Sequence, residues 1–134
     1  FQAEDGIRHC LLSRGLGDVY KRQDLCSQLY VLFPNYKIED LWIASYGLGD
    51  YTESHDHRGF DWSFVWYLDA CINCSPLTFP NLKHPWLPPH VIYPKVGNLH
   101  VFDGGLVHYV CPHTCTHDRV VVSGNLTTYN SDKK

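Results

Sequence analysis

Short apolar runs separated by turns containing glycine or proline follow one another along residues 24–129. Runs of this length that are rich in aromatic and β-branched residues are typical of β-strands. The predicted strands are residues 41–46, 62–68, 77–79, 90–93, 99–102, 106–110 and 119–126. Residues 25–33 instead predict a helix, which ends at Pro34 and Asn35. The pattern therefore predicts an all-β sandwich or barrel.

Composition and charge narrow the class of protein. Hydrophobic residues make up 44% of the 134 residues and aromatic residues 14%, which predicts one globular domain with a packed core. The net charge is −3 and the basic residues form no run, so we expect no nucleic-acid partner. No apolar stretch approaches the roughly 18 residues that cross a bilayer, and no secretory signal is recognisable. We expect a cytoplasmic protein without a membrane partner.

The first 23 residues, FQAEDGIRHCLLSRGLGDVYKRQ, differ in character from the rest. The blocks QAEDGIR and SRGLGDVYKRQ resemble translated oligonucleotide adapters from high-throughput sequencing. This resemblance implies that residues 1–23 are not native, that Cys10 has no function, and that the domain at residues 24–129 is truncated at its N-terminus. The absence of methionine also predicts a fragment or a processed product. The alternative is a genuine basic arm. Residues 130–134 form a polar tail.

Three histidines form the candidate metal site. His55 and His57 flank Asp56 in a predicted loop, and His108 follows far downstream. Because residues i and i+2 of an extended chain point the same way, His55 and His57 can face one metal while Asp56 points away. Three protein ligands leave the open positions that an oxygen-activating iron needs. If Asp56 faces the metal instead, the ligands become two histidines and one carboxylate.

Arg119 opens the last predicted strand and carries a permanent charge that can bind a carboxylate through two parallel hydrogen bonds. Isolated histidines are usually ordinary surface or core residues, and a chain with nine histidines contains some H-x-H pairs by chance. The interpretation as a site therefore depends on the order of these residues and on the sequence around them.

That surrounding sequence resembles the 2-oxoglutarate- and iron(II)-dependent oxygenases, which include prolyl hydroxylases. The similar segments are ASYG (44–47), GDY (49–51), HDH (55–57), VWYL (65–68), PKVGNLHVF (94–102), LVHYV (106–110) and DRVVVSGNL (118–126). The similarity covers residues 42–126 and is greatest to the branch of this family whose first motif reads H-x-H. It implies a double-stranded β-helix, or jelly roll.

The resemblance also implies roles for individual residues. His55 and His108 would be the two histidine ligands of iron(II), and His57 stands where most of the superfamily has Asp or Glu. Arg119 would hold the distal carboxylate of 2-oxoglutarate, and Tyr67 would hydrogen-bond the same carboxylate. With an imidazole in place of the usual carboxylate, the iron site lacks one negative charge.

Two further residues belong to the co-substrate pocket that the resemblance implies. Tyr46 would line it. Ser123 lies on the same strand face as Arg119 and can replace a serine that many relatives have at the position of Val121. The aromatic residues Trp62, Trp66 and Trp86 can shape the site of the primary substrate, although aromatic residues in strands more often belong to the core.

The implied activity is the oxidative decarboxylation of 2-oxoglutarate by O₂, coupled to hydroxylation of a substrate that the sequence does not identify. Two alternatives stay open. A cupin-like enzyme with three histidine ligands would need no 2-oxoglutarate, and therefore no carboxylate-binding pair of Arg119 and Tyr67. A non-catalytic jelly-roll binding module would contain no iron.

Four cysteines form a second candidate metal site. Two follow the predicted strand that carries Tyr67, and two precede Arg119. In the jelly roll that the resemblance implies, these two strands are antiparallel neighbours, so all four cysteines would reach the same rim. The candidate zinc ligands are Cys71, Cys74, Cys111 and Cys115, with His113 and His117 as alternatives. Four thiolates can bind a structural zinc tetrahedrally if their sulfurs lie within about 4 Å of one another. Free thiols and disulfides are the other options.

Overall fold

The computed structural model describes residues 25–129, and no helix among them is long and apolar enough to cross a bilayer. Residues 1–23 with Cys10, and the tail at residues 130–134, lie outside the described residues. The predicted helix is present at residues 25–32. The strands of the described part are β1 (Tyr36–Tyr46), β2 (Thr52–His55), β3 (Trp62–Asp69), β4 (Leu77–Phe79), β5 (His90–Ile92), β6 (Leu99–Asp103), β7 (His108–Val110) and β8 (Arg119–Thr128).

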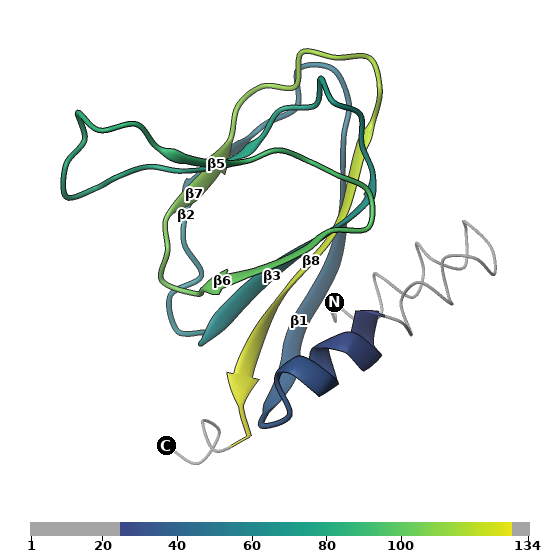
Figure 1. The fold of residues 1–134 in the computed structure, drawn as a ribbon, viewed down its shortest axis with the longest axis vertical. Helices are drawn as coiled ribbons and strands as arrows, with labels where there is room; N and C mark the ends of the chain where they lie inside the picture. The colour runs from purple at the N-terminus through teal and green to yellow at the C-terminus, as the bar shows by residue number, and fades with distance from the viewer. Residues whose placement is uncertain (1–24, 130–134) are drawn as a thin grey trace.

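The strands form two four-stranded antiparallel sheets that face each other (Figure 1). The larger sheet has the order β1-β8-β3-β6, and the smaller has the order β2-β7-β4-β5. Apart from the β4–β5 hairpin, every connection carries the chain from one sheet to the other. This winding is that of a double-stranded β-helix, so the predicted all-β jelly roll is confirmed.

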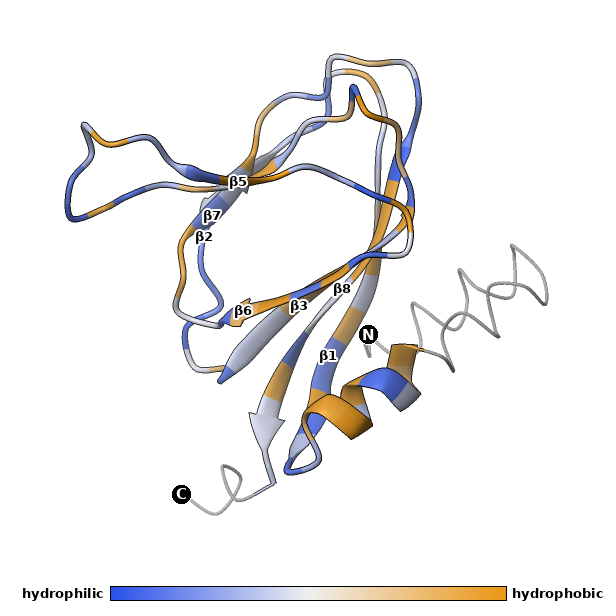
Figure 2. Ribbon diagram, in the orientation of Figure 1, coloured by the Kyte–Doolittle hydropathy of each residue, from blue (hydrophilic) through white to orange (hydrophobic). Residues whose placement is uncertain are grey.

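The two faces of the larger sheet support two hydrophobic clusters, because successive side chains of a strand point to opposite faces. Phe64 and Trp66 of β3 point to the outer face, where they pack with Leu25 and Leu29 of the helix. Val65 points between the sheets and packs with residues of both. Figure 2 shows the corresponding alternation of hydrophobic and hydrophilic residues along β1. The inward face is thereby available to carry a site.

The largest differences between the structure and the predicted strands are in β1, β2 and β7. β1 begins at Tyr36 rather than at residue 41, because its first half alternates polar and apolar residues while it pairs with the end of β8. His55 is the last residue of β2, a strand that was not predicted. The run at residues 106–110 contributes only a three-residue strand beginning at His108.

Candidate metal centre

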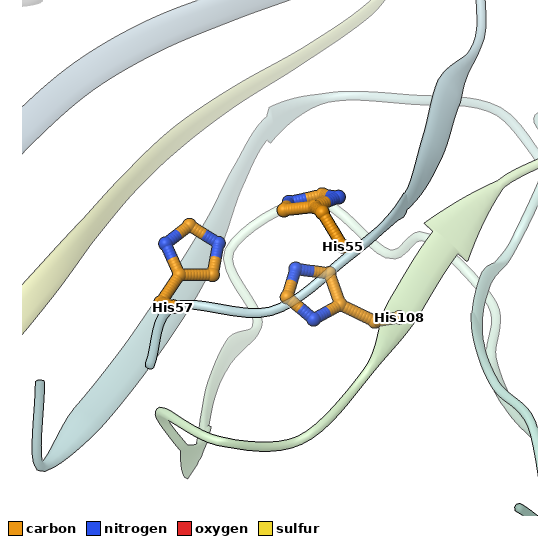
Figure 3. A group of neighbouring side chains, drawn as sticks. All are labelled: His55, His57 and His108. Carbon is orange, nitrogen blue, oxygen red and sulfur yellow. The ribbon is translucent and has the colours of Figure 1, made fainter. Parts of the chain in front are cut away.

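The three predicted histidine ligands lie together between the sheets, and Figure 3 shows their rings facing one another. β2 pairs with β7 so that His55 stands opposite His108. His57 follows two residues after β2 and completes the group. One ligand nitrogen of each residue lies within 4.8 Å of the others. The pairing of two strands thus brings residues that are distant in sequence to one point.

Backbone carbonyl groups orient two of these rings. The Nδ1 atom of His55 lies 2.7 Å from the carbonyl oxygen of Glu53, and Nδ1 of His108 lies 2.9 Å from that of Leu106. Because a carbonyl oxygen only accepts hydrogen bonds, each Nδ1 carries the proton. The Nε2 lone pairs of both rings are therefore available to a metal ion.

His57 is held neutral by its surroundings. Burial, followed by the neighbouring His108 and His55, lowers its pKa to about 4. Its ring also stacks on Trp42, with ring centroids 5.8 Å apart and an interplanar angle of 13°. Burial likewise lowers the pKa of His108. Neutral imidazoles are the form that binds metal ions.

Asp56 is engaged elsewhere. Its carboxylate accepts hydrogen bonds of 2.9 Å from the backbone N–H and from the guanidinium of Arg58. These bonds, first of all the backbone one, lower the pKa of Asp56. The structure therefore groups His57, and not Asp56, with the other two histidines.

The histidines open onto a cavity of about 160 Å³ between the sheets. Arg119, Tyr46 and Ser123, three residues of the predicted co-substrate pocket, line the same cavity. Arg119, Val121 and Ser123 reach it from alternate positions of β8. The cavity is therefore bordered by a group suited to a metal and by a permanent positive charge.

The guanidinium of Arg119 is buried, and two of its nitrogen atoms have no hydrogen-bond acceptor among the described residues. The residue is 2% exposed, and its Nε and Nη1 atoms have no hydrogen-bond partner among residues 25–129. The rings of Tyr46 and Tyr67 lie 4.8 Å and 5.4 Å from its Cζ atom and stabilise the cation through their faces. A buried charge without hydrogen-bonding partners is unfavourable, so this pocket fits an anionic group.

Tyr67 is the residue predicted to share the co-substrate carboxylate with Arg119, and its ring lies against the guanidinium. It contacts Arg119 and is fully buried, but it is not among the residues that line the cavity. Its hydroxyl has no hydrogen-bond partner among the described residues, and burial raises its pKa. Tyr67 therefore packs beside the guanidinium and keeps a protonated hydroxyl near it.

Trp42 and Thr52 are among the residues of the cavity wall that were not predicted. Trp42 could have been found from sequence, because Trp42, Ala44 and Tyr46 alternate along one face of β1. Thr52 could not. It lies three positions before His55, yet both line the cavity, because the register of β2 against β7 shifts between them. The hydroxyl groups of Thr52 and Tyr46 form a hydrogen bond.

Three of the four candidate zinc ligands also lie together. The sulfur atoms of Cys71, Cys74 and Cys115 are within 4.8 Å of one another. Cys111 is exposed and outside this group, so the predicted four-cysteine set is not formed. Its neighbour Val110 ends β7 with a buried side chain, and the next residue of an extended chain points to the opposite side.

Gly104 supports the turn that carries His57. A Cβ atom at this position would lie 2.1 Å from the carbonyl oxygen of Phe60 and 3.1 Å from that of His57. The N–H of His57 donates to the carbonyl of Gly104 at 2.8 Å. The close approach of the two backbones requires a residue without a side chain.

Gly104→Ala is therefore expected to lower the free energy of unfolding by at least about 2 kcal/mol, because the backbone must shift to relieve the overlap. It should also weaken metal binding by displacing His57. Gly47→Ala is the matched control, since its Cβ would meet only side-chain oxygens at 3.6 and 3.7 Å. Denaturant unfolding of both variants checks the expectation, and equal stability would contradict the packing role.

Comparisons with known proteins show similarity in fold alone. No protein-family model matches the sequence, and no curated protein matches it either. An oxidoreductase of the 2OG-Fe(II) oxygenase family from Burkholderia pseudomallei has a TM-score of 0.61 and 17% identity, over 71% of this chain and 46% of that one. A Pseudomonas putida prolyl-4-hydroxylase has a TM-score of 0.56 and 23% identity, over 81% and 62%.

A third similar structure is the non-heme alpha-ketoglutarate-dependent epimerase SnoN from nogalamycin biosynthesis, with a TM-score of 0.65 and 12% identity. The match covers 88% of this chain and 59% of SnoN. The chain thus spans between 46% and 62% of the length of these three structures.

Proposed function

We infer that this chain is a non-haem iron oxygenase that uses 2-oxoglutarate. The observation that supports this most strongly is the buried, incompletely satisfied guanidinium of Arg119 in the same cavity as His55, His57 and His108. A metal-binding group alone is compatible with many reactions. A metal-binding group with an enclosed cation beside it selects for a co-substrate that chelates through one end and is anionic at the other.

The residues present fit both iron(II) and 2-oxoglutarate. Neutral imidazoles are suitable ligands for iron, and three of them leave coordination positions for a chelating keto acid and O₂. When bound, iron(II), 2-oxoglutarate and O₂ supply the oxidising chemistry that hydroxylates a C–H bond. The histidines would hold the metal, and Arg119 would hold the distal carboxylate of the co-substrate.

The remaining wall of the cavity orients the co-substrate and excludes water. Val65, Leu77, Phe102 and Val121 line it with apolar surface, which strengthens the attraction between the guanidinium and a carboxylate. Ser123 also lines the cavity, and a serine hydroxyl can donate to the same anion. Because the three imidazoles contribute no negative charge, the dianionic co-substrate would compensate the charges of both the metal and Arg119.

A metal enzyme with three histidine ligands but without 2-oxoglutarate is the second candidate. The all-imidazole group favours it, because most 2-oxoglutarate oxygenases have a carboxylate where this chain has His57. This second candidate, however, gives the buried guanidinium of Arg119 no function. The two candidates therefore make different predictions about ligands that carry a distal carboxylate.

The test compares ligands on the iron(II)-loaded protein under anaerobic conditions. We expect 2-oxoglutarate to raise the melting temperature, because a ligand that binds the folded state stabilises it. The matched ligand 2-oxobutyrate has the keto acid but no distal carboxylate and should stabilise the protein much less. On admission of O₂, succinate should form from 2-oxoglutarate. Iron binding with equal responses to both ligands, and no succinate, would favour the second candidate.

A further inference from the structure

A second group of metal-ligand side chains lies at the rim of the jelly roll, apart from the histidines. Cys71 and Cys74 belong to the β3–β4 connection, and Cys115 belongs to the β7–β8 connection. The sulfur of Cys71 is 3.7 Å from that of Cys74 and 3.4 Å from that of Cys115. Two connections that are far apart in sequence therefore present three thiols to one point.

These separations match a tetrahedral thiolate site. Zn–S bonds of about 2.3 Å in a tetrahedron place the sulfur atoms about 3.8 Å apart. A disulfide would need a sulfur separation of about 2.05 Å. The arrangement thus has the spacing of a metal site rather than that of a bonded pair.

Backbone N–H groups point at the sulfurs. The N–H of Cys71 donates to the sulfur of Cys74 at 3.2 Å, and the N–H of His117 donates to that of Cys115 at 3.3 Å. Such bonds stabilise the negative charge of a thiolate, which is the form that binds a metal. The turn from Cys71 to Cys74 is closed by a 3.1 Å bond from the N–H of Cys74 to the carbonyl of Cys71.

Cys71 and Cys115 line a surface hollow. Of the residues that line this hollow, His117 is the one with an imidazole. Its Nε2 atom lies 2.9 Å from the Oδ1 atom of Asp69. Because the carboxylate accepts, Nε2 carries the proton, and in the neutral ring the Nδ1 lone pair is free to bind a metal. His117 is not within the 4.8 Å group of sulfurs, so its ring must move toward them to coordinate.

We propose that Cys71, Cys74 and Cys115 bind one structural zinc ion, with His117 as the fourth ligand. The zinc joins the β3–β4 and β7–β8 connections where β3 ends and β8 begins. Tyr67 lies two residues before the end of β3, and Arg119 is the first residue of β8. The metal therefore fixes the two strand ends that carry the guanidinium and its aromatic neighbour.

The zinc site is tested in a variant whose histidine centre is disabled, His55→Ala with His108→Ala, so that the result is independent of the proposed oxygenase activity. Protein purified under reducing conditions should contain one equivalent of zinc. Replacement with cobalt(II) should produce an intense thiolate-to-metal charge-transfer band. Cys71→Ser and Cys115→Ser should each lose most of this band. Cys111→Ser is the matched control and should retain it.

Mapping of alkylated cysteines by mass spectrometry tests the proposal even if the serine variants do not fold. Without a chelator, Cys71, Cys74 and Cys115 should be protected and Cys111 labelled. A chelator should expose all three together and lower the melting temperature. Absence of a bound divalent metal, a disulfide between Cys71 and Cys115 in the purified protein, or equal labelling of all four would overturn the proposal. An unchanged zinc affinity in His117→Ala would overturn the assignment of the fourth ligand.

Discussion

Arg119→Leu is expected to abolish the turnover of 2-oxoglutarate while iron(II) remains bound. The guanidinium would supply two charge-assisted hydrogen bonds to the distal carboxylate, each contributing about 1.5–3 kcal/mol. Their loss should weaken co-substrate binding by about 100-fold or more. The histidines lie on β2, β7 and the segment after β2, so their geometry does not depend on this side chain. Succinate formation and the iron content of the same sample are the two measurements.

The leucine variant should fold. Arg119 is 2% exposed, and its Nε and Nη1 atoms have no hydrogen-bond partner among the described residues. Leucine is shorter than arginine, but it removes a buried charge that is not fully hydrogen-bonded, and apolar replacement of buried charges is often neutral or stabilising. We therefore expect the free energy of unfolding, measured without co-substrate, to stay equal or to rise.

Arg119→Lys separates charge from geometry. Lysine keeps the positive charge but cannot form two parallel hydrogen bonds, so intermediate turnover is expected. The discriminating ligand is 2-oxobutyrate, whose binding should be the same in the wild type and in Arg119→Leu. Turnover of 2-oxoglutarate at the wild-type rate in the leucine variant would contradict the 2-oxoglutarate proposal.

Much of the fold could be predicted from the sequence because the apolar runs coincide with strands that are buried between neighbours. β4 has the predicted bounds, and β3 differs from the prediction by a single residue, Asp69. The first half of β1 could not be predicted, because residues 36–40 include Lys37 and Glu39 and contain no continuous apolar run. What makes them a strand is pairing with the end of β8, a long-range contact that the local pattern does not contain.

The candidate site was predictable where it depends on residue type and order, and unpredictable where it depends on register. The histidines and Arg119, the first residue of β8, were identified from their order along the chain and from the resemblance of the sequence around them. Thr52 was missed because an irregularity in β2 turns it toward the cavity out of the normal alternation. Cys111 was included because sequence spacing alone does not show that its side chain lies outside the sulfur group.

His57 and Asp56 are adjacent candidates for the second metal ligand, and the iron(II) affinities of their alanine variants distinguish them. His57→Ala is expected to weaken iron(II) binding by at least about 100-fold. This exceeds the roughly 10–100-fold loss that follows mutation of a residue that only hydrogen-bonds a metal ligand. Its ring is one of three that converge, with centroids 5.0 Å from His55 and 5.1 Å from His108. Asp56→Ala should leave the affinity almost unchanged, because the carboxylate is engaged with Arg58.

Both affinities can be measured by titrating the metal-free variants with iron(II) under anaerobic conditions. The pKa of His57, about 4, means that no proton has to leave this ring when the metal binds at neutral pH. Removing His57 therefore removes a ligand without changing the charge of the metal-free site. A large loss in Asp56→Ala with little change in His57→Ala would reverse the assignment, since it requires the carboxylate to turn inward and replace the imidazole. The centre would then have two histidines and one carboxylate, and the negative charge that three imidazoles lack would come from Asp56.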